Sequence, residues 1–482
     1  MTTFQLSDIM RILPEIILCA FGILVMVLDP LVAARKRSLL GWLALLGLVA
    51  AAGGTAWTSR GPGPAFGRSV VADPFSFYFF YLFLLVAALT VLGSIHYLER
   101  DRLQHGEFYA LILMGTAGMC FMAGSTDLIM IFIGLEISSI STYILVGFRR
   151  RDALANEASL KYFLLGSFAT AFFLYGIAFV YGLTSTTNLL ELSARLAHPG
   201  QWTTLARVAL LLMFVGLAFK LSTVPFQVWT PDVYQVAPAP VTAYLSVGPK
   251  AAAFAVLLRI LLGGLASAAS LSFWLIWVSA ILTMTLGNLA AIRQTNLKRL
   301  LAYSAIAHAG YILVGVAAGG NQGASAVLFY LTAYALMNAG AFVLIAHLAG
   351  NGELSTQIED FTGLAYARPG TAACLTVFLL SLAGFPTTAG FFGKFFLFRA
   401  AIHSHLIGLT TIALLNSVVS VYYYLHVIVA MYMREGEPRA STTALPSPLR
   451  AALAVSVIGI FYLGLFPNLF LTLSNAAGIP LP

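Results

Sequence analysis

Four ionisable side chains lie deep inside long apolar stretches of this sequence, where a charge is costly unless it has a partner or a function. They are Glu136, Lys220, Lys250 and Lys394. Lys220 stands thirteen residues after Arg207 and twelve before Asp232, which places it about 18 to 20 Å from either charge along a helix. That depth is too great for its amine to reach a polar surface fully. Amines and carboxylates in such positions are suited to ion chemistry.

Glu136 is a candidate partner for Lys220. It lies nine residues after Asp127 and thirteen before Arg149, so it is also well inside an apolar span. At about 4 Å and an effective dielectric constant near 20, the two charges would attract each other by about 4 kcal/mol. Making and breaking that contact would decide whether Lys220 keeps its proton. A static ion pair that fastens two helices is the alternative, but buried charges in membranes favour the functional interpretation.

Helix-breaking prolines accompany the three lysines. Pro225 follows Lys220 by five residues, Pro249 directly precedes Lys250, and Pro386 lies eight residues before Lys394. Proline cannot donate a backbone hydrogen bond, so the carbonyl four residues earlier loses its helical partner. We therefore expect interrupted helices at Pro225 and Pro386, and an opened carbonyl beside Lys250. For Lys394, an alternative is that the side chain extends towards the membrane surface near Arg399.

Two further residues are weaker candidates. His308 lies about ten residues from Lys298 and Arg299, near the middle of an apolar span. Histidine titrates near neutral pH and can pass protons, although a neutral, hydrogen-bonded core histidine is the alternative. Lys161 follows Glu157 by four residues, which is the spacing of an ion pair on a helix face. Structural and functional roles are equally open for Lys161.

The composition restricts the fold to a multi-pass membrane protein. Of 482 residues, 60% are hydrophobic and 9% are charged, and the mean hydropathy is +0.90. Long apolar runs must form helices to satisfy their own backbone, so we expect an all-α fold of about fourteen transmembrane helices. The expected spans are 11–29, 38–57, 75–97, 107–123, 126–147, 157–183, 205–229, 239–262, 272–291, 297–317, 324–349, 371–402, 407–433 and 450–474.

The net charge of +8 reflects topology rather than nucleic-acid binding. Arginine and lysine are concentrated by roughly two to one in alternate short loops, which the positive-inside rule assigns to the inner side. Both termini are then expected outside. The first apolar segment has no basic leader and no small-residue cleavage site, so we interpret it as a permanent span.

Searches for other chemistry give nothing. Cys19, Cys120 and Cys374 are far apart and fit packing roles rather than a cluster or a zinc site. The sequence contains no GxxxxGK[ST] loop, no HExxH and no dinucleotide fingerprint after a strand. We therefore expect neither nucleotide nor metal catalysis by this chain.

Two long, interrupted spans suggest an internal repeat. Spans 205–229 and 371–402 are five spans apart and share an L-x-x-x-P core, from Leu221 to Pro225 and from Leu382 to Pro386. A five-helix repeat reverses its orientation in the membrane, so the two sets would be inverted repeats, as in many transporters. The expected organisation is a peripheral layer of helices 1–3 over 1–105, a first repeat of helices 4–8 over 106–265, a second repeat of helices 9–13 over 266–435, and helix 14 over 436–482.

Four segments closely resemble one family. They are NEASLKYFLLGSFATAFFLYG (156–176), FKLSTVPFQVWTPDVYQVAPAPVTAYLSVGPKAA (219–252), LAYSAIAHAGY (301–311) and GFPTTAGFFGKFFLF (384–398). They are similar to subunit N of bacterial NADH-quinone oxidoreductase, respiratory complex I, and the resemblance extends over nearly the whole chain. It implies fourteen helices, with helices 4–8 and 9–13 as inverted repeats. It also implies proton pumping driven by quinone reduction elsewhere in the complex.

The resemblance implies a role for each candidate residue. Glu136 on helix 5 would pair with Lys220 on helix 7, and Lys161 would modulate that pair. Lys250 on helix 8 would be the central relay, with His308 passing protons towards Lys394 near an outlet. The chain departs from the family at Gln227, where a histidine is common. Glutamine can hydrogen-bond a chain of waters but cannot titrate, so a proton-transfer step assigned to that histidine is in doubt here.

The resemblance also implies partners and a location. NADH, flavin mononucleotide, the iron-sulfur clusters and quinone would be handled by other subunits, with no cofactor bound by this chain. The neighbours would be other membrane subunits, of the antiporter-like M and small K types, in the lipid bilayer of a bacterial inner membrane. The nearest alternative is a subunit of a multisubunit cation/proton antiporter or of a membrane-bound hydrogenase. A non-transporting scaffold is an alternative of another class.

Overall fold

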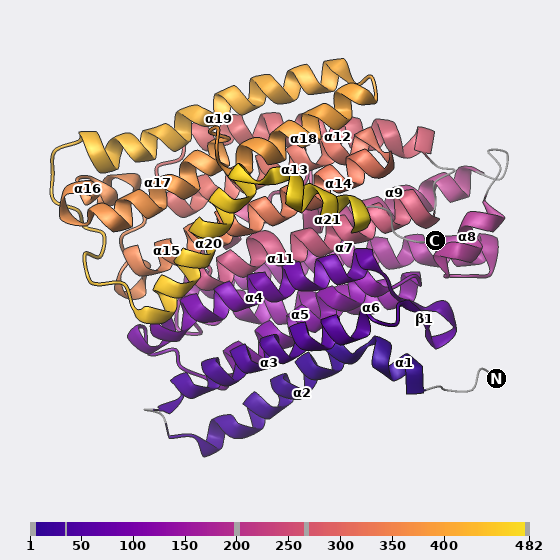
Figure 1. The fold of residues 1–482 in the computed structure, drawn as a ribbon, viewed down its shortest axis with the longest axis horizontal. Helices are drawn as coiled ribbons and strands as arrows, with labels where there is room; N and C mark the ends of the chain where they lie inside the picture. The colour runs from indigo at the N-terminus through magenta and orange to yellow at the C-terminus, as the bar shows by residue number, and fades with distance from the viewer. Residues whose placement is uncertain (1–5, 34–35, 197–202, 265–268, 478–482) are drawn as a thin grey trace.

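The chain forms a bundle of long, roughly aligned helices (Figure 1). The computed structural model describes residues 6–33, 36–196, 203–264 and 269–477. Within these ranges, thirteen helices are long and apolar enough to cross a membrane, and Pro369–Ala383 is a shorter apolar helix. The expected all-α, multi-pass fold is confirmed. The inverted repeats and the four-region division remain predictions.

The helices and strands occupy the following ranges. The α-helices are α1 Leu6–Arg11, α2 Leu13–Leu28, α3 Ser38–Thr58, α4 Pro74–Arg100, α5 Gly106–Gly124, α6 Leu128–Val146, α7 Ala153–Thr184, α8 Leu189–Arg195, α9 Thr204–Leu221, α10 Trp229–Val236, α11 Ala239–Leu258, α12 Ala269–Ile292, α13 Leu297–Ala318, α14 Gly320–Tyr334, α15 Gly340–Leu348, α16 Leu364–Ala367, α17 Pro369–Ala383, α18 Ala389–His403, α19 Ile407–Met433, α20 Ser447–Leu465 and α21 Pro467–Ala477. Two π-helical turns, η5 Arg259–Gly264 and η7 Ala335–Ala339, extend α11 and join α14 to α15. Short 3₁₀ turns are η1 Asp29–Leu31, η3 Phe66–Arg68, η8 Asn351–Glu353 and η9 Ile358–Phe361, and the strands are β1 Gly63–Ala65 and β2 Val70–Ala72.

The two ends of the bundle are distinct. Strands β1 and β2 pair antiparallel, with Gly63 opposite Ala72, directly before α4 begins. We call this end of the bundle the hairpin end; it is on the right in Figure 1. The opposite end contains the C-terminus of α4, the N-terminus of α11 and the buried residue Glu353. We call it the Glu353 end.

Burial divides the spanning helices into a core and an outer layer. The most apolar windows of α11 and α13 are each 89% buried, and that of α14–η7–α15 is 100% buried, whereas those of α2 and α19 are 28% buried. Close backbone approach fixes this core. A Cβ added at Gly310 would lie 2.5 Å from the backbone nitrogen of Met284, so α12 and α13 meet where only glycine fits. The core helices carry Lys250 and His308.

Both expected helix interruptions are present. Helix α9 ends at Leu221, Ser222 adopts a left-handed conformation with φ of 60°, and α10 begins only at Trp229. In the second case, α17 ends at Ala383 and Gly384 has φ of 90°, where a residue without a Cβ is favoured. Both breaks begin before the proline. A buried lysine lies beside each one: Lys220 is in the last turn of α9, and Lys394 contacts the Ala383 carbonyl at the end of α17.

The opened carbonyl expected beside Lys250 is present. Helix α11 continues through Pro249, and the Leu245 carbonyl, which lacks a helical N–H partner there, accepts a hydrogen bond from the Tyr234 hydroxyl at 3.4 Å. One sequence expectation was wrong in detail. The last expected span, 450–474, is divided: α20 ends at Leu465 and α21 starts at Pro467. Proline is well placed at the start of a new helix because its missing N–H would be unpaired there anyway.

Candidate proton-translocation site

Lys220 occupies an aromatic pocket rather than a salt bridge. Its ammonium nitrogen lies 3.4 Å from the Tyr143 hydroxyl and 5.0 Å from the centre of that ring. The ring of Tyr162 is 5.3 Å away. These contacts stabilise a cation by hydrogen bonding and by cation–π attraction. Among the described residues, Lys220 has no carboxylate within 4.0 Å.

Glu136 is close to this pocket but does not contact the amine. One of its carboxyl oxygens is buried without a hydrogen-bond partner among the described residues. Glu136 lies seven residues, or about two turns, before Tyr143 on α6, so the two side chains are on the same face of that helix. Tyr143 therefore lies on the face of the acid and contacts the amine. The predicted neighbourhood of Glu136 and Lys220 is present, while the direct ion pair is absent from the described part of the chain.

A glycine makes room for the Tyr143 hydroxyl. A Cβ added at Gly166 on α7 would lie 2.0 Å from that hydroxyl oxygen. The Tyr143 ring also packs edge-on against Tyr162, with ring centres 4.7 Å apart. Helix α7 therefore holds the phenol of α6 against the amine of α9.

Lys161 lies on the surface of α7 with 49% of its side chain exposed. Its amine pairs with Glu157 at 2.7 Å, as the spacing predicted, and lies 3.7 Å from Asp232 on α10. Helix α10 is the segment directly after the break that follows Lys220. Lys161 thus connects α7 to the far side of that break without entering the buried pocket.

Lys250 is buried at the junction of the two halves of the chain. Its amine donates a hydrogen bond to the Ala305 carbonyl on α13 at 2.7 Å. It also lies 5.8 Å from the centre of the Tyr334 ring. The Tyr334 hydroxyl has no hydrogen-bond partner among the described groups, so polar capacity remains free beside Lys250.

His308 lies between Lys250 and Lys394 in a cluster of tyrosines. Its two ring nitrogens contact the hydroxyls of Tyr330 and Tyr424, the latter at 3.0 Å. The rings of Tyr334 and Tyr311 flank the imidazole at centre-to-centre distances of 5.3 and 5.7 Å. Because both ring nitrogens have hydroxyl partners, the imidazole can take a proton at one side and give one up at the other.

Lys394 is the last amine of the series. It donates to the Ala383 carbonyl and to the Ser417 hydroxyl, both at 2.9 Å, and lies 5.1 Å from the centre of the Tyr311 ring. The side chain is buried, so it does not extend towards Arg399. The Ala383 carbonyl at the end of α17, which the broken helix leaves without a helical partner, is thus the acceptor for this amine.

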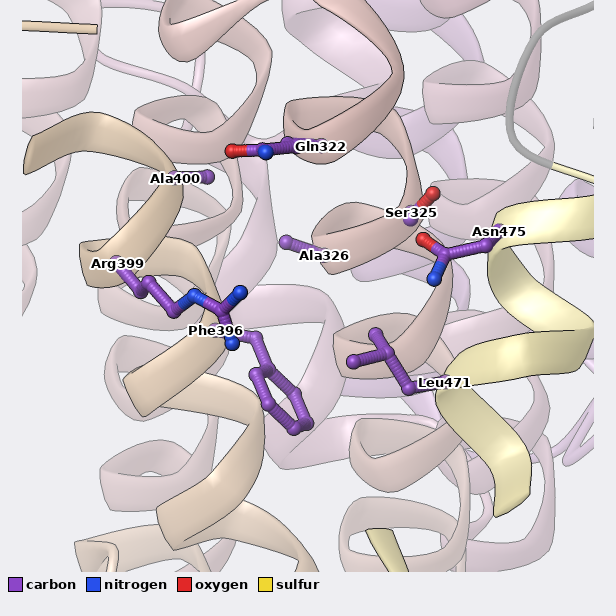
Figure 2. A pocket seen from close by; sticks show the side chains of 8 residues that line it. All are labelled: Gln322, Ser325, Ala326, Phe396, Arg399, Ala400, Leu471 and Asn475. Carbon is purple, nitrogen blue, oxygen red and sulfur yellow. The ribbon is translucent and has the colours of Figure 1, made fainter. Parts of the chain in front are cut away.

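A cavity of about 130 Å³ lies beside α18 near Lys394, but on another face of the helix. Figure 2 shows Arg399 and Phe396 of α18 facing Gln322 and Ser325 of α14 and Asn475 of α21. Arg399 is five residues beyond Lys394, which turns it about 140° around the helix. Lys394 faces α13, α17 and α19 instead, so this cavity does not open onto its amine.

Tyr311, Tyr334 and Tyr143 were not found by sequence reasoning, because buried tyrosine is common in apolar cores and gives no local signal. Together they connect the predicted residues: Tyr334 lies between Lys250 and His308, and Tyr311 lies between His308 and Lys394. No such direct side-chain bridge is present between Lys220 and Lys250 in the described ranges. Gln227 lies in the break after α9, and its side-chain amide oxygen is buried without a hydrogen-bond partner among the described residues.

Glu353 is another residue that the sequence did not reveal. Its carboxylate accepts hydrogen bonds from Tyr97 at 2.7 Å and from the backbone N–H of Ala239 at 2.6 Å. It pairs with Lys298 at 2.5 Å and with Arg149 at 3.1 Å. Burial alone would raise the pKa of this carboxyl, but the charges of Lys298 and Arg149 outweigh burial and hold it below its ordinary value.

Comparison with known proteins identifies the family of this chain. Residues 125–420 match the family described as NADH:quinone oxidoreductase/Mrp antiporter, TM. NADH-quinone oxidoreductase subunit N 1 of Solibacter usitatus is 50% identical over 466 residues, covering 96% of each chain. The chain belongs to the subunit N family of NADH-quinone oxidoreductase. It is thus a membrane subunit of the antiporter-like class, as its motifs predicted.

Solved structures support the family assignment. A chain of respiratory complex I from Thermus thermophilus, solved with bound aureothin, is 35% identical and superposes with a TM-score of 0.82, covering 96% of this chain and 99% of that one. A chain of the Mrp complex from Dietzia superposes with a TM-score of 0.84 at 23% identity, covering 99% of this chain and 97% of that one. The second likeness shows the shared fold alone. The identity to subunit N therefore favours this family over the antiporter alternative.

Metal binding has no support in the described ranges. There, no group of three or more His, Cys, Asp or Glu side chains is arranged to hold a metal ion. The three cysteines are free, with Cys120 buried and Cys19 and Cys374 partly buried.

Proposed function

We propose that this chain translocates protons as the N subunit of a complex that oxidises NADH and reduces quinone in other subunits. In this proposal Glu136 and Lys220 are the coupling pair, and Lys250, His308 and Lys394 carry the proton across the middle of the membrane. Lys161 adjusts the coupling pair from the surface of α7, through Asp232 on α10.

One observation carries the proposal: the three buried lysines donate to neutral oxygen atoms. Their partners are the Tyr143 hydroxyl for Lys220, the Ala305 carbonyl for Lys250, and the Ala383 carbonyl and Ser417 hydroxyl for Lys394. A permanent structural lysine in such an apolar position would need a paired carboxylate. An amine held only by neutral acceptors can instead gain and lose a proton during turnover. The tyrosine and histidine bridges between Lys250 and Lys394 support lateral transfer.

The coupling step follows from electrostatics. If Glu136 moves to contact Lys220, attraction at about 4 Å favours the charged amine by about 4 kcal/mol at an effective dielectric constant near 20. When the acid moves away, that stabilisation is lost and the proton is released towards Lys250. The described arrangement corresponds to the separated state, with Tyr143 contacting the amine. Gln227 then serves as a hydrogen-bonding group in the gap after α9, and not as a titrating one.

The remaining assignments are part of the same proposal. Residues 106–265 and 266–435 act as inverted repeats, and each contributes one helix interrupted beside a buried lysine. The chain lies in a bacterial inner membrane, with both termini outside. Its neighbours are further membrane subunits of the complex, of the M and K types, and it binds no cofactor of its own.

The test is Lys220→Ala in the intact complex, reconstituted into vesicles. We expect loss of most proton pumping and of coupled NADH:quinone turnover, with assembly retained. Lys36→Ala, at an exposed lysine between α2 and α3, is the matched control and should behave as the parent complex. A normal proton-to-electron ratio in Lys220→Ala would refute the assignment. If Glu136 and Lys220 can be removed together with pumping intact, the scaffold alternative holds instead.

A further inference from the structure

Helix α11, which carries Lys250, is fixed at both ends by buried ionic groups. At the Glu353 end, the Glu353 carboxylate accepts the backbone N–H of Ala239, the first residue of α11. At the hairpin end, the helix runs into Arg259, which is 1% exposed. Along α11, apolar side chains lie between Lys250 and the hairpin end, and hydroxyl side chains lie between Lys250 and the Glu353 end.

The hairpin end of α11 is closed by a bidentate ion pair between Arg259 and Asp73. The two guanidinium nitrogens each donate to one carboxylate oxygen at 3.1 Å, and both side chains are 1% exposed. The third guanidinium nitrogen donates to the Ala123 carbonyl at 3.0 Å, and the group lies 4.8 Å from the centre of the Phe75 ring. Such a planar fork is specific to arginine.

This pair joins the ends of three helices. Asp73 caps the N-terminus of α4, where its side chain also accepts the Ser76 N–H at 2.7 Å. Ala123 lies in the last turn of α5, where backbone carbonyls have no partner within the helix. Arg259 follows the last residue of α11. The pair therefore satisfies polar groups at one point that would otherwise attract water into the bundle.

The stretch of α11 between this pair and Lys250 is apolar. Every residue of α11 from Ala251 to Leu258 is hydrophobic and at most 3% exposed. Phe254 lies one turn from Lys250 and Leu258 lies two turns from it on the same face. In the other direction, Ser246 and Thr242 occupy the matching positions and form hydrogen bonds. Along α11, polar side chains that can support a chain of waters thus approach Lys250 from the Glu353 end, while the hairpin side of this helix is apolar.

We propose that Asp73 and Arg259 form a seal that prevents protons from passing between Lys250 and the hairpin end, so that a proton on Lys250 leaves sideways, through the second half of the chain. They are positioning residues, since neither touches the proton path. The proposal rests on the proton-carrying role of Lys250 argued above. Its physical basis is that removing one partner leaves a buried, uncompensated charge, which draws in water.

The experiment measures passive proton flow in vesicles that contain the intact complex without substrate. Arg259→Gln is expected to increase proton permeability several-fold and to abolish the stimulation of NADH oxidation by an uncoupler. Arg150→Gln is the matched control, because Arg150 makes an exposed ion pair with Glu107 at 2.6 Å and should leave both readouts unchanged.

Two further variants keep the seal testable if Arg259→Gln does not assemble. Arg259→Lys retains the charge but cannot span both carboxylate oxygens and the Ala123 carbonyl, so a smaller leak is expected. Proton permeability equal to that of the parent complex in Arg259→Lys would overturn the proposal. Adding Lys250→Met to Arg259→Lys should remove the leak if it passes through Lys250. A proton leak that persists in the double variant would also overturn the proposed seal. If Lys250 is not a proton carrier at all, Lys250→Met alone should pump normally, which distinguishes that failure from a failure of the seal.

Discussion

The Tyr143 hydroxyl is the hydrogen-bonding partner that the structure gives Lys220, and removing it tests the coupling pair. Tyr143→Phe deletes the oxygen that lies 3.4 Å from the amine and keeps the ring whose centre is 5.0 Å away. The cation–π attraction therefore persists, while the hydrogen bond is lost. The change is almost isosteric, so the packing against Tyr162 should survive.

The size of the effect follows from the contact. A hydrogen bond to a charged group contributes about 1.5 to 3 kcal/mol at normal length, and 3.4 Å is near the long limit, so we take about 1 kcal/mol. That energy corresponds to roughly a fivefold change in the population of the protonated amine. If formation of this state limits coupled turnover, the rate should fall by about fivefold.

The assay is NADH:quinone turnover and proton uptake by reconstituted vesicles, with electron transfer to an artificial acceptor as the internal reference. Tyr175→Phe is the control, because Tyr175 is an exposed tyrosine on α7 whose ring packs against Phe179 and lies outside the Lys220 pocket. We expect a loss in Tyr143→Phe and none in Tyr175→Phe. Unchanged coupled turnover in Tyr143→Phe would refute the view that this hydroxyl holds Lys220 between contacts with Glu136.

Two other predictions concern residues that position the buried groups. Gly166→Ala places a Cβ 2.0 Å from the Tyr143 hydroxyl, which must then move by at least about 1 Å to reach a tolerable 3.0 Å. Coupled turnover should therefore fall as in Tyr143→Phe. The double variant should lose no more turnover than either single variant. Additive losses would contradict this. Glu353→Gln should lower the heat-inactivation midpoint of the complex at pH 7, because breaking a buried charge network costs about 3 to 5 kcal/mol. The ion pairs with Lys298 and Arg149 outweigh burial and hold the pKa of Glu353 below its ordinary 4.5. That stabilisation is therefore complete above pH 4.5 and is lost as the pH falls through the lowered pKa, so the difference between the two complexes should shrink below pH 4.5. A difference that stays constant as the pH is lowered below 4.5 would contradict this.

The buried amines could be predicted from sequence because each is an isolated charge in an apolar span. Lys220, Lys250 and Lys394 need no partner to be noticed, since the length of the span alone fixes their depth. The breaks at Pro225 and Pro386 were predictable for a similar local reason, as proline removes a specific hydrogen bond. Pro249 likewise frees the Leu245 carbonyl, which accepts a hydrogen bond from the Tyr234 hydroxyl, and there the helix continues.

The partners of these residues could not be predicted, because they come from distant parts of the chain. Asp73 meets Arg259 from 186 residues away, and Glu353 meets Tyr97 from 256 residues away. Both acids lie at the ends of apolar spans. A charge is expected near water there, so the sequence does not indicate that these side chains are buried. Tyr143 gives no local signal either. Only the packed arrangement of the helices distinguishes these residues from ordinary surface and core positions.

The central claim is that a proton passes through Lys250 on its way from α9 to α18. Its most direct test is the proton-to-electron ratio of the complex carrying Lys250→Met, measured in vesicles at matched rates of NADH oxidation. The account predicts a ratio clearly below that of the parent complex, together with slower coupled turnover. A parental ratio at matched turnover would contradict it, because protons would then cross the complex without the amine that joins the two halves of this chain.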